Sequence, residues 1–324
     1  MSKDSNKVKV STFPGCTTKD MHDHIKPILK ELGNDLRSAH IANCVFNNFL
    51  SYTAIMLNIV TIHAIRKASS VPKTLKTLLL SLAVSDLGVG LLGQPLYTSV
   101  LAKLLQKQNP GCHTYLVFGF IVTVFLFASF FGVVTISVDR FLAIHLHLRY
   151  QELVTHKRVV TVVISIWLLS VFLSLTPSWI SLDIYSLISL FLDVIGFLLT
   201  TVVYIRIYFA ARRHKNQIQT LQAQGGAENG EMTNFASLVK SAVGVFYVYL
   251  VFLVCYLPFF ISVAAVAING SSISLKRFSL FSWTLLFLNS SLNPLIYCWK
   301  MRHIRHAIMD LLRNMPWFRN RGTR

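Results

Sequence analysis

Seven long apolar segments restrict the possible folds of this chain more than any other feature of its sequence. They cover residues 41–65, 75–100, 114–144, 158–181, 184–210, 238–268 and 278–299. A helix needs about 20 mostly apolar residues to cross ~30 Å of hydrocarbon. Only helices and closed barrels satisfy their backbone hydrogen bonds in lipid, and these segments lack the alternating pattern of barrel strands. The sequence therefore predicts an all-α membrane protein with a bundle of seven transmembrane helices.

Composition and charge agree with a membrane protein. Of the 324 residues, 53% are hydrophobic and only 14% are charged, whereas about a quarter of a soluble domain is charged. The net charge of +18 would suit nucleic acid, but most of the 31 Lys and Arg residues lie beside alternate spans, on one side of the membrane. This bias predicts a multi-pass plasma-membrane protein with its N-terminus outside and its C-terminus in the cytoplasm. We expect the basic residues to attract membrane lipids, and we expect no nucleic-acid partner.

The spans divide the chain into three parts. Residues 1–40 form an extracellular N-terminal tail, residues 41–299 form the seven-transmembrane bundle, and residues 300–324 lie in the cytoplasm. Apolar residues recur at helical spacing in this last part, at Ile304, Ile308, Leu311, Leu312 and Met315. This pattern predicts a short amphipathic helix on the inner membrane surface. A frayed basic tail is the alternative.

Asp86 lies deep in the second predicted span, where an ionised group costs about 3 kcal/mol. Polar residues occur at similar depth in other spans, namely Asn58, Ser129, Asn289, Ser290 and Asn293. A carboxyl group among hydroxyl and amide groups can hold a proton or bind a hard cation such as sodium. Alternatively, the polar groups only hold the helices together through hydrogen bonds.

Two prolines interrupt predicted spans, Pro258 in the sixth and Pro294 in the seventh. A proline inside a helix removes one backbone hydrogen bond and bends the helix, and Asn293 can satisfy groups that the break leaves free. The pair Asp139–Arg140 lies at the inner end of the third span. Taken alone, this pair is also consistent with two interfacial side chains that reach for water.

Together these segments resemble the rhodopsin-like (class A) G-protein-coupled receptors. The matching motifs, in chain order, are LNIV, LAVSDL, SVDRFLAI, FLVCYLP and NSSLNPLIY, with single tryptophan and tyrosine residues in the fourth and fifth spans, Trp167 and Tyr204. The resemblance implies a receptor that converts the binding of an extracellular ligand into nucleotide exchange on a heterotrimeric G protein. It also implies that the protein is not an enzyme, in agreement with the absence of HExxH and GxSxG motifs.

The resemblance implies roles for particular residues. A sodium pocket would be lined by Asp86, Ser129, Asn289 and Asn293. The activation switch would comprise Asp139, Arg140, Tyr204, Phe252, Tyr256, Pro258, Pro294 and Tyr297. Apart from a structural sodium ion, the family comparison implies no cofactor.

The outer halves of the spans form a mostly apolar ligand pocket in this comparison. Its expected residues are Gln94, Val122, Thr123, Leu126, Asp193, Phe259, Phe260, Trp283 and Phe287. Val122 stands where amine receptors of the family carry an aspartate, and Phe287 stands where retinal-binding members carry a lysine. With Asp193 as its buried charge, the pocket suits a lipid, a small amphiphile, or a peptide or amine that presents a cation. Alternatively, the aromatic side chains simply pack between helices.

The chain also departs from the usual pattern of the family. Tyr115 occupies the third-helix position of the common extracellular disulfide, so Cys112 either pairs with Cys16 or remains a free thiol. Gly196 replaces the usual proline of the fifth helix. With a very short connection between the fourth and fifth spans, these departures are similar to the melanocortin, cannabinoid, adenosine and lysophospholipid receptors. An ion channel or transporter that uses Asp86 in an ion pathway is the alternative function.

Overall fold

The computed structural model describes residues 34–68, 71–108, 110–146, 149–180, 182–223, 229–270 and 272–313. These residues form helices and short connections, and no β-strand occurs among them. The predicted all-α fold is therefore confirmed. The question of whether Cys112 pairs with Cys16 falls outside the described residues, because Cys16 precedes them.

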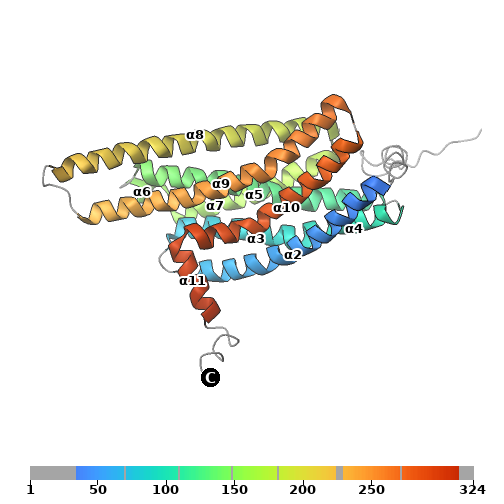
Figure 1. The fold of residues 1–324 in the computed structure, drawn as a ribbon. Helices are drawn as coiled ribbons and strands as arrows, with labels where there is room; N and C mark the ends of the chain where they lie inside the picture. Colours follow the sequence, from blue (N-terminus) through green and yellow to red (C-terminus); the bar gives the residue numbers. More distant parts are fainter. Residues whose placement is uncertain are drawn as a thin grey trace, which may run out of the picture.

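Seven long helical segments run back and forth along one common direction (Figure 1). They are α2 (Asn34–Lys67), then α3 (Lys73–Gly88) continued by the π-helical turn η1 (Val89–Gly93) and α4 (Gln94–Leu105), α5 (Cys112–Leu146), α7 (His156–Leu175) with the 3₁₀ turn η3 (Thr176–Ser178), α8 (Leu182–Ala223), α9 (Asn229–Asn269) and α10 (Ile273–Lys300). Two short helices complete the described part of the chain, α6 (Tyr150–Leu153) and α11 (Arg302–Arg313). Each predicted span falls on one of the seven segments, although most helices extend beyond the apolar run.

Six of the seven segments are long and apolar enough to cross a membrane, and α10 is not among these six. The reason is the polar content of α10, which carries Lys276 and Arg277 near its start and Asn289 and Asn293 in its second half. Both asparagines are buried inside the bundle. Their polarity lowers the mean hydropathy of the helix without exposing polar groups on the outer face.

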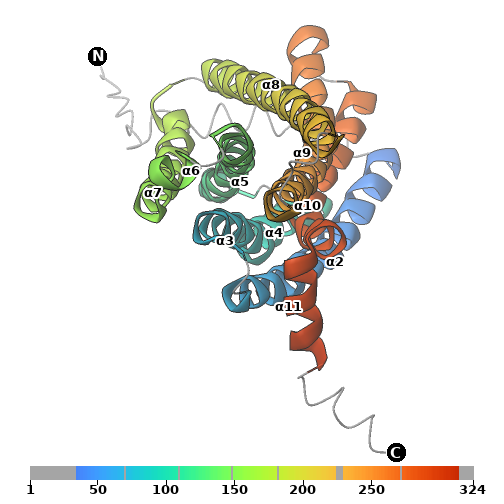
Figure 2. The ribbon, with the colours of Figure 1, turned by 90° about the vertical axis from the view of Figure 1, so that its left-hand side faces the viewer.

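Helix α5 lies inside the ring formed by the other segments, and Figure 2 shows it end-on between α3, α7, α8 and α9. It packs against all four of these helices. The ring closes through α10, which packs against both α9 and α2. Side chains of α5 therefore connect the helices on several sides of the bundle.

The distribution of side chains is inverted relative to a soluble protein. Large apolar side chains such as Phe49, Leu168 and Phe191 are exposed on the outer faces of α2, α7 and α8. Polar side chains such as Asn58 and Asp86 are completely buried. This arrangement suits a bundle surrounded by lipid, whose hydrocarbon tails solvate the apolar faces while the polar groups bond with one another.

Helix α11 is the short amphipathic helix that the apolar repeat predicts. It leaves the end of α10 at an angle and crosses the end of the bundle (Figure 1). Ile304 and Ile308 are buried, and the helix packs against α2 and α10. Lys300 precedes it and places its Nζ over the rings of Tyr247 and Trp299, at 3.9 and 3.5 Å from the centroids. These contacts hold the end of the Lys300 side chain against α9 and the last turn of α10.

Candidate functional site: cavity, buried carboxylate and inner ion pair

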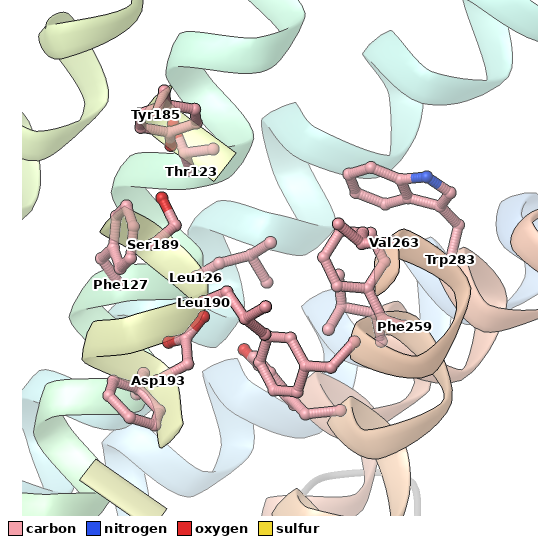
Figure 3. A pocket seen from close by; sticks show the side chains of 14 residues that line it. Thr123, Leu126, Phe127, Tyr185, Ser189, Leu190, Asp193, Phe259, Val263 and Trp283 are labelled. Atoms are coloured by element: carbon pink, nitrogen blue, oxygen red, sulfur yellow. The ribbon is translucent and has the colours of Figure 1, made fainter. Parts of the chain in front are cut away.

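A cavity of about 140 Å³ lies between α5, α8, α9 and α10. Figure 3 shows its side chains, which come from α5 and α8 on one side and from α9 and α10 on the other. The lining residues are Thr123, Leu126, Phe127, Phe130, Tyr185, Ser189, Leu190, Asp193, Tyr256, Phe259, Phe260, Val263, Trp283 and Leu286. Most of this surface is apolar, and its polar atoms come from a few hydroxyl groups and one carboxyl group.

The structure brings six of the nine expected pocket residues to this cavity. They are Thr123, Leu126, Asp193, Phe259, Phe260 and Trp283. The other three, Gln94, Val122 and Phe287, do not line it. Val122 and Phe287 belong to a packed cluster with Tyr97, whose ring centroid lies 5.2 Å from that of Phe287, and this cluster adjoins the cavity through Leu126 and Trp283. Gln94 is fully buried, and neither polar atom of its side chain has a hydrogen-bond partner within the described part of the chain.

Sequence reasoning missed most of the wall that α8 contributes. Tyr185, Ser189 and Asp193 follow one another at intervals of four residues, so they lie on one face of α8. The side chain of Tyr185 hydrogen-bonds to those of Ser189 and Thr123. The helical repeat running back from Asp193 was the sequence signal that could have identified both missed residues.

Below the cavity, Asp86 occupies the centre of a polar cluster. Its side chain is 0% exposed. Asn293 donates a hydrogen bond from Nδ2 to Asp86 Oδ2 at 2.7 Å, and Ser129 donates one to Oδ1 at 3.4 Å. The hydroxyl of Ser85 lies 2.8 Å from that of Ser129. Three of the four residues expected in a sodium pocket therefore meet here, and they come from α3, α5 and α10.

The fourth expected residue, Asn289, is buried one helical turn before Asn293. Its Oδ1 has no hydrogen-bond partner within the described residues, and the Oδ1 atoms of Asn293 and Asn58 also lack one there. Neutral oxygen atoms beside a buried carboxylate are the donor set that a hard cation requires. The residues present therefore fit a sodium ion.

Near the C-terminal end of α5, which the sequence places at the inner membrane face, the side chains of Asp139 and Arg140 form a buried ion pair. The Nε of Arg140 lies 3.0 Å from Asp139 Oδ2. Tyr150, on α6, donates a hydrogen bond of 2.6 Å to the other carboxyl oxygen. Because the hydroxyl proton of Tyr150 points to Asp139, Thr74 of α3 donates to Tyr150 at 3.2 Å. Tyr150 thus links α6 to both α5 and α3.

Tyr150 was not among the residues expected to form the switch. Burial, and next the negative charge of Asp139, raise the pKa of Tyr150 to about 12. Tyr150 follows the ion pair by ten residues in the loop sequence LHLRY, outside the predicted spans, so the apolar pattern gave no signal for this contact.

Two other expected switch residues, Tyr204 and Tyr297, lie near the inner end of the bundle without contacting each other through a hydrogen bond in the described residues. Ser137 donates its proton to Val133 O at 2.8 Å, so Tyr204 donates to Ser137 Oγ at 3.0 Å. The ring of Tyr204 stacks on Tyr249 of α9, with centroids 5.4 Å apart. The hydroxyl of Tyr297 is buried and has no partner in the described part of the chain.

The remaining switch residues connect the cavity to this inner end. The ring of Tyr256 lines the cavity and stacks on Phe252, with centroids 3.8 Å apart and an interplanar angle of 18°. Phe252 in turn contacts the rings of Phe130 and Phe197. Pro258 lies within α9 and Pro294 within α10. Both helices continue past their prolines, and α9 is visibly bent in Figure 1.

Comparison with known proteins places this geometry in a family. The model of the 7 transmembrane receptor (rhodopsin family) matches residues 57–184 and 178–297, which together cover most of the bundle. Adenosine receptor A2a of Canis lupus familiaris is 26% identical over 306 residues, with 82% of this chain and 70% of the receptor covered. Melanocortin receptor 4 of Danio rerio is 26% identical over 278 residues, with 81% of each chain covered. Melanocortin receptor 5 of Homo sapiens is 26% identical over 277 residues, covering 81% of this chain and 82% of the receptor. The chain belongs to the rhodopsin family of seven-transmembrane, G-protein-coupled receptors.

Proposed function

We propose that an extracellular ligand enters the cavity between α5, α8, α9 and α10 and that its binding moves α9 outward at the inner end. The opened inner face would then receive a heterotrimeric G protein and promote its exchange of GDP for GTP. The ligand would be a lipid, a small amphiphile or a peptide. In this proposal the protein acts as a receptor and catalyses no reaction of its own.

The observation that carries this proposal is a continuous set of aromatic contacts from the cavity to the inner ion pair. Tyr256 lies in the cavity wall and stacks on Phe252. Phe252 contacts Phe197, and Phe197 contacts Tyr249, which stacks on Tyr204. Tyr204 hydrogen-bonds to Ser137, one helical turn before Arg140. A ligand that displaces Tyr256 therefore acts on a series of packed rings that ends at Ser137, one helical turn before Arg140.

The ion pair at the inner end supports a switch of this kind. Within the described residues Arg140 pairs with Asp139, its own neighbour on α5. Movement of α9 would therefore not need to break an ion pair with Arg140. A ligand shifts the balance of the two states only by its difference in affinity, and about 5.5 kcal/mol moves it from 1:99 to 99:1.

The membrane orientation and the ion site belong to the same proposal. The N-terminus would lie outside and the C-terminus in the cytoplasm, so the end with Arg140 and α11 would face the G protein and anionic lipids. A sodium ion held by Asp86, Ser129, Asn289 and Asn293 would stabilise the state with the inner face closed. The alternative function as an ion channel or transporter has no support from the family or from the similar receptors.

Nucleotide exchange in a purified system tests the proposal. The receptor is reconstituted in lipid nanodiscs with a panel of purified heterotrimeric G proteins, and binding of a non-hydrolysable GTP analogue is followed without added ligand. We expect exchange above the receptor-free rate with at least one G protein, since among the described residues no ion pair with α9 restrains Arg140. Arg140→Ala should abolish this exchange, and Lys103→Ala, near the outer end of α4, should leave it unchanged. Ion flux through reconstituted vesicles without exchange on any G protein would refute the proposal.

A further inference from the structure

One carboxyl group in the cavity has no partner among the residues that the structure describes. Asp193 is 8% exposed and contributes its carboxyl group to the cavity wall. Within the described residues it forms no ion pair, and the lining contains no Lys, Arg or His. An unpaired carboxylate inside a membrane-spanning bundle carries a large desolvation cost, so its presence points to a group that binds there and offsets this cost.

The polar atoms of the cavity gather around Asp193. Ser189 precedes it by one helical turn, and Tyr185 and Thr123 complete a hydroxyl-bearing wall. Figure 3 shows these four side chains on one side of the cavity, opposite Phe259 and Trp283. The cavity is therefore divided into a negatively charged, hydrogen-bonding side and an aromatic side.

The aromatic side of the cavity suits the binding of a flat apolar group. Phe259 and Trp283 pack edge to face, with centroids 4.9 Å apart, and Phe260 lies 6.0 Å from Phe259. The buried hydroxyl of Tyr256, which also lines the cavity, has no partner in the described part of the chain. A ring placed between these groups would be held by edge-to-face contacts and by apolar burial.

The volume limits the size of the occupant. The cavity measures about 140 Å³, and an engineered apolar cavity of about 150 Å³ binds benzene. A single ring with a short chain therefore fits without a large rearrangement, whereas a long acyl chain or a folded peptide would have to open the bundle. The small volume of the cavity and the carboxyl group of Asp193 together favour a small cationic ligand over a long lipid or a folded peptide.

We propose that the ligand of this receptor carries one protonated amine beside a single apolar ring, and that the ammonium group pairs with Asp193 while the ring lies against Phe259 and Trp283. In this proposal the group that binds the amine lies on α8. Val122 of α5, which stands where amine receptors of the family carry an aspartate, does not line the cavity. This inference rests on the proposed function only in taking the cavity as the ligand site. Its chemistry can be supplied by a free arylalkylamine or by the N-terminus of a short peptide that begins with an aromatic residue.

Binding to the purified receptor in nanodiscs, measured by isothermal titration calorimetry, tests the charge requirement. The probes are phenethylamine, its neutral counterpart 2-phenylethanol and its anionic counterpart phenylacetate. We expect phenethylamine to bind at least roughly tenfold more tightly than 2-phenylethanol, because only the amine offsets the buried carboxylate, and we expect no binding of phenylacetate. Phenylalanyl-glycinamide tests whether the amine comes from a peptide N-terminus, since only a peptide site admits this larger free amine. Its N-acetylated form lacks the positive charge and should not bind in either case.

Substitution then assigns the charge to one residue. Asp193→Asn should weaken phenethylamine at least roughly tenfold and leave 2-phenylethanol unchanged. The matched control is Asp310→Asn, an exposed aspartate on α11, which should bind both probes like the wild type. If Asp193→Asn does not fold, the comparison of the three probes on the wild-type receptor still decides the question.

Equal binding of the amine and the alcohol, or preference for the anion, would overturn the inference. Nucleotide exchange by the same preparation would show that the proposed function survives this result. Conversely, Asp193-dependent amine binding without exchange on any G protein would support the inference while the proposed function fails.

Discussion

The ring of Phe130 occupies the space beside Gly196 in which any other residue would place its Cβ. A Cβ built on Gly196 would lie 2.2 Å from Phe130 Cζ. The ring cannot easily retreat, because it is 2% exposed and contacts Phe131, Phe197 and Phe252. The close approach of α5 and α8 therefore requires glycine at position 196.

Gly196→Ala should accordingly destabilise the receptor. Overpacking of a well-packed core costs about 1–3 kcal/mol, which exceeds the roughly 1 kcal/mol by which alanine favours a helix over glycine. We expect a lower melting temperature in detergent, measured by loss of the monodisperse peak after heating. Gly119→Ala is the control, since no atom lies within 4 Å of a Cβ built there. Equal melting temperatures for the two variants would contradict this account of the contact.

The buried cluster around Asp86 predicts a sodium-dependent stability. At a sodium concentration ten times its dissociation constant, binding to the folded state would add about 1.4 kcal/mol. The wild-type receptor should therefore melt at a higher temperature in sodium chloride than in choline chloride of the same concentration. Asp86→Asn should remove this difference, because the amide carries no charge for the cation, and Asp310→Asn should retain it. A sodium effect that persists in Asp86→Asn would exclude this site.

The hydroxyls of Tyr256 and Tyr204, at the two ends of the aromatic contacts between the cavity and Ser137, should respond differently to removal. The hydroxyl of Tyr256 is buried and has no partner within the described residues, whereas that of Tyr204 donates to Ser137. An unmade buried hydrogen bond costs about 1–3 kcal/mol, and a made one contributes about 1 kcal/mol. Tyr256→Phe should therefore keep or raise the thermal stability measured in detergent, while Tyr204→Phe should lower it. The reverse order would refute the hydrogen-bond assignment.

Much of the fold follows from the sequence because the membrane imposes two simple requirements. Apolar length identified the spans, and the cost of buried polar groups drew attention to Asp86 and Asp193 before any contact was known. The motif around Asn293 placed it near Asp86, and the structure joins the two by a hydrogen bond. The apolar length of a span and the depth of a polar residue within it are both properties of a single helix, so the sequence of that helix is enough to predict them.

What the sequence left open depends on how helices face one another. Val122 and Thr123 are adjacent, yet only Thr123 lines the cavity, because a rotation of about 100° per residue turns Val122 toward Tyr97 and Phe287. Tyr150 lies outside the spans, so the apolar pattern carries no information about its bond to Asp139. Rotation about the helix axis and the path of connecting segments are set by packing across helices, which no single span encodes.

The bond between Tyr150 and Asp139 predicts how stability changes in alkali. Burial and the charge of Asp139 raise the pKa of Tyr150 from 10.0 to about 12, so folding favours the protonated phenol. This contribution is complete below pH 10 and is lost as the pH rises from 10 to 12, because the unfolded state releases its proton first. Melting temperatures of the wild type should thus fall toward those of Tyr150→Phe across this interval, whereas Tyr208→Phe, an exposed tyrosine on α8, serves as the control for general alkaline damage. A constant difference between the wild type and Tyr150→Phe from pH 9 to 12 would show that the phenol does not donate to Asp139.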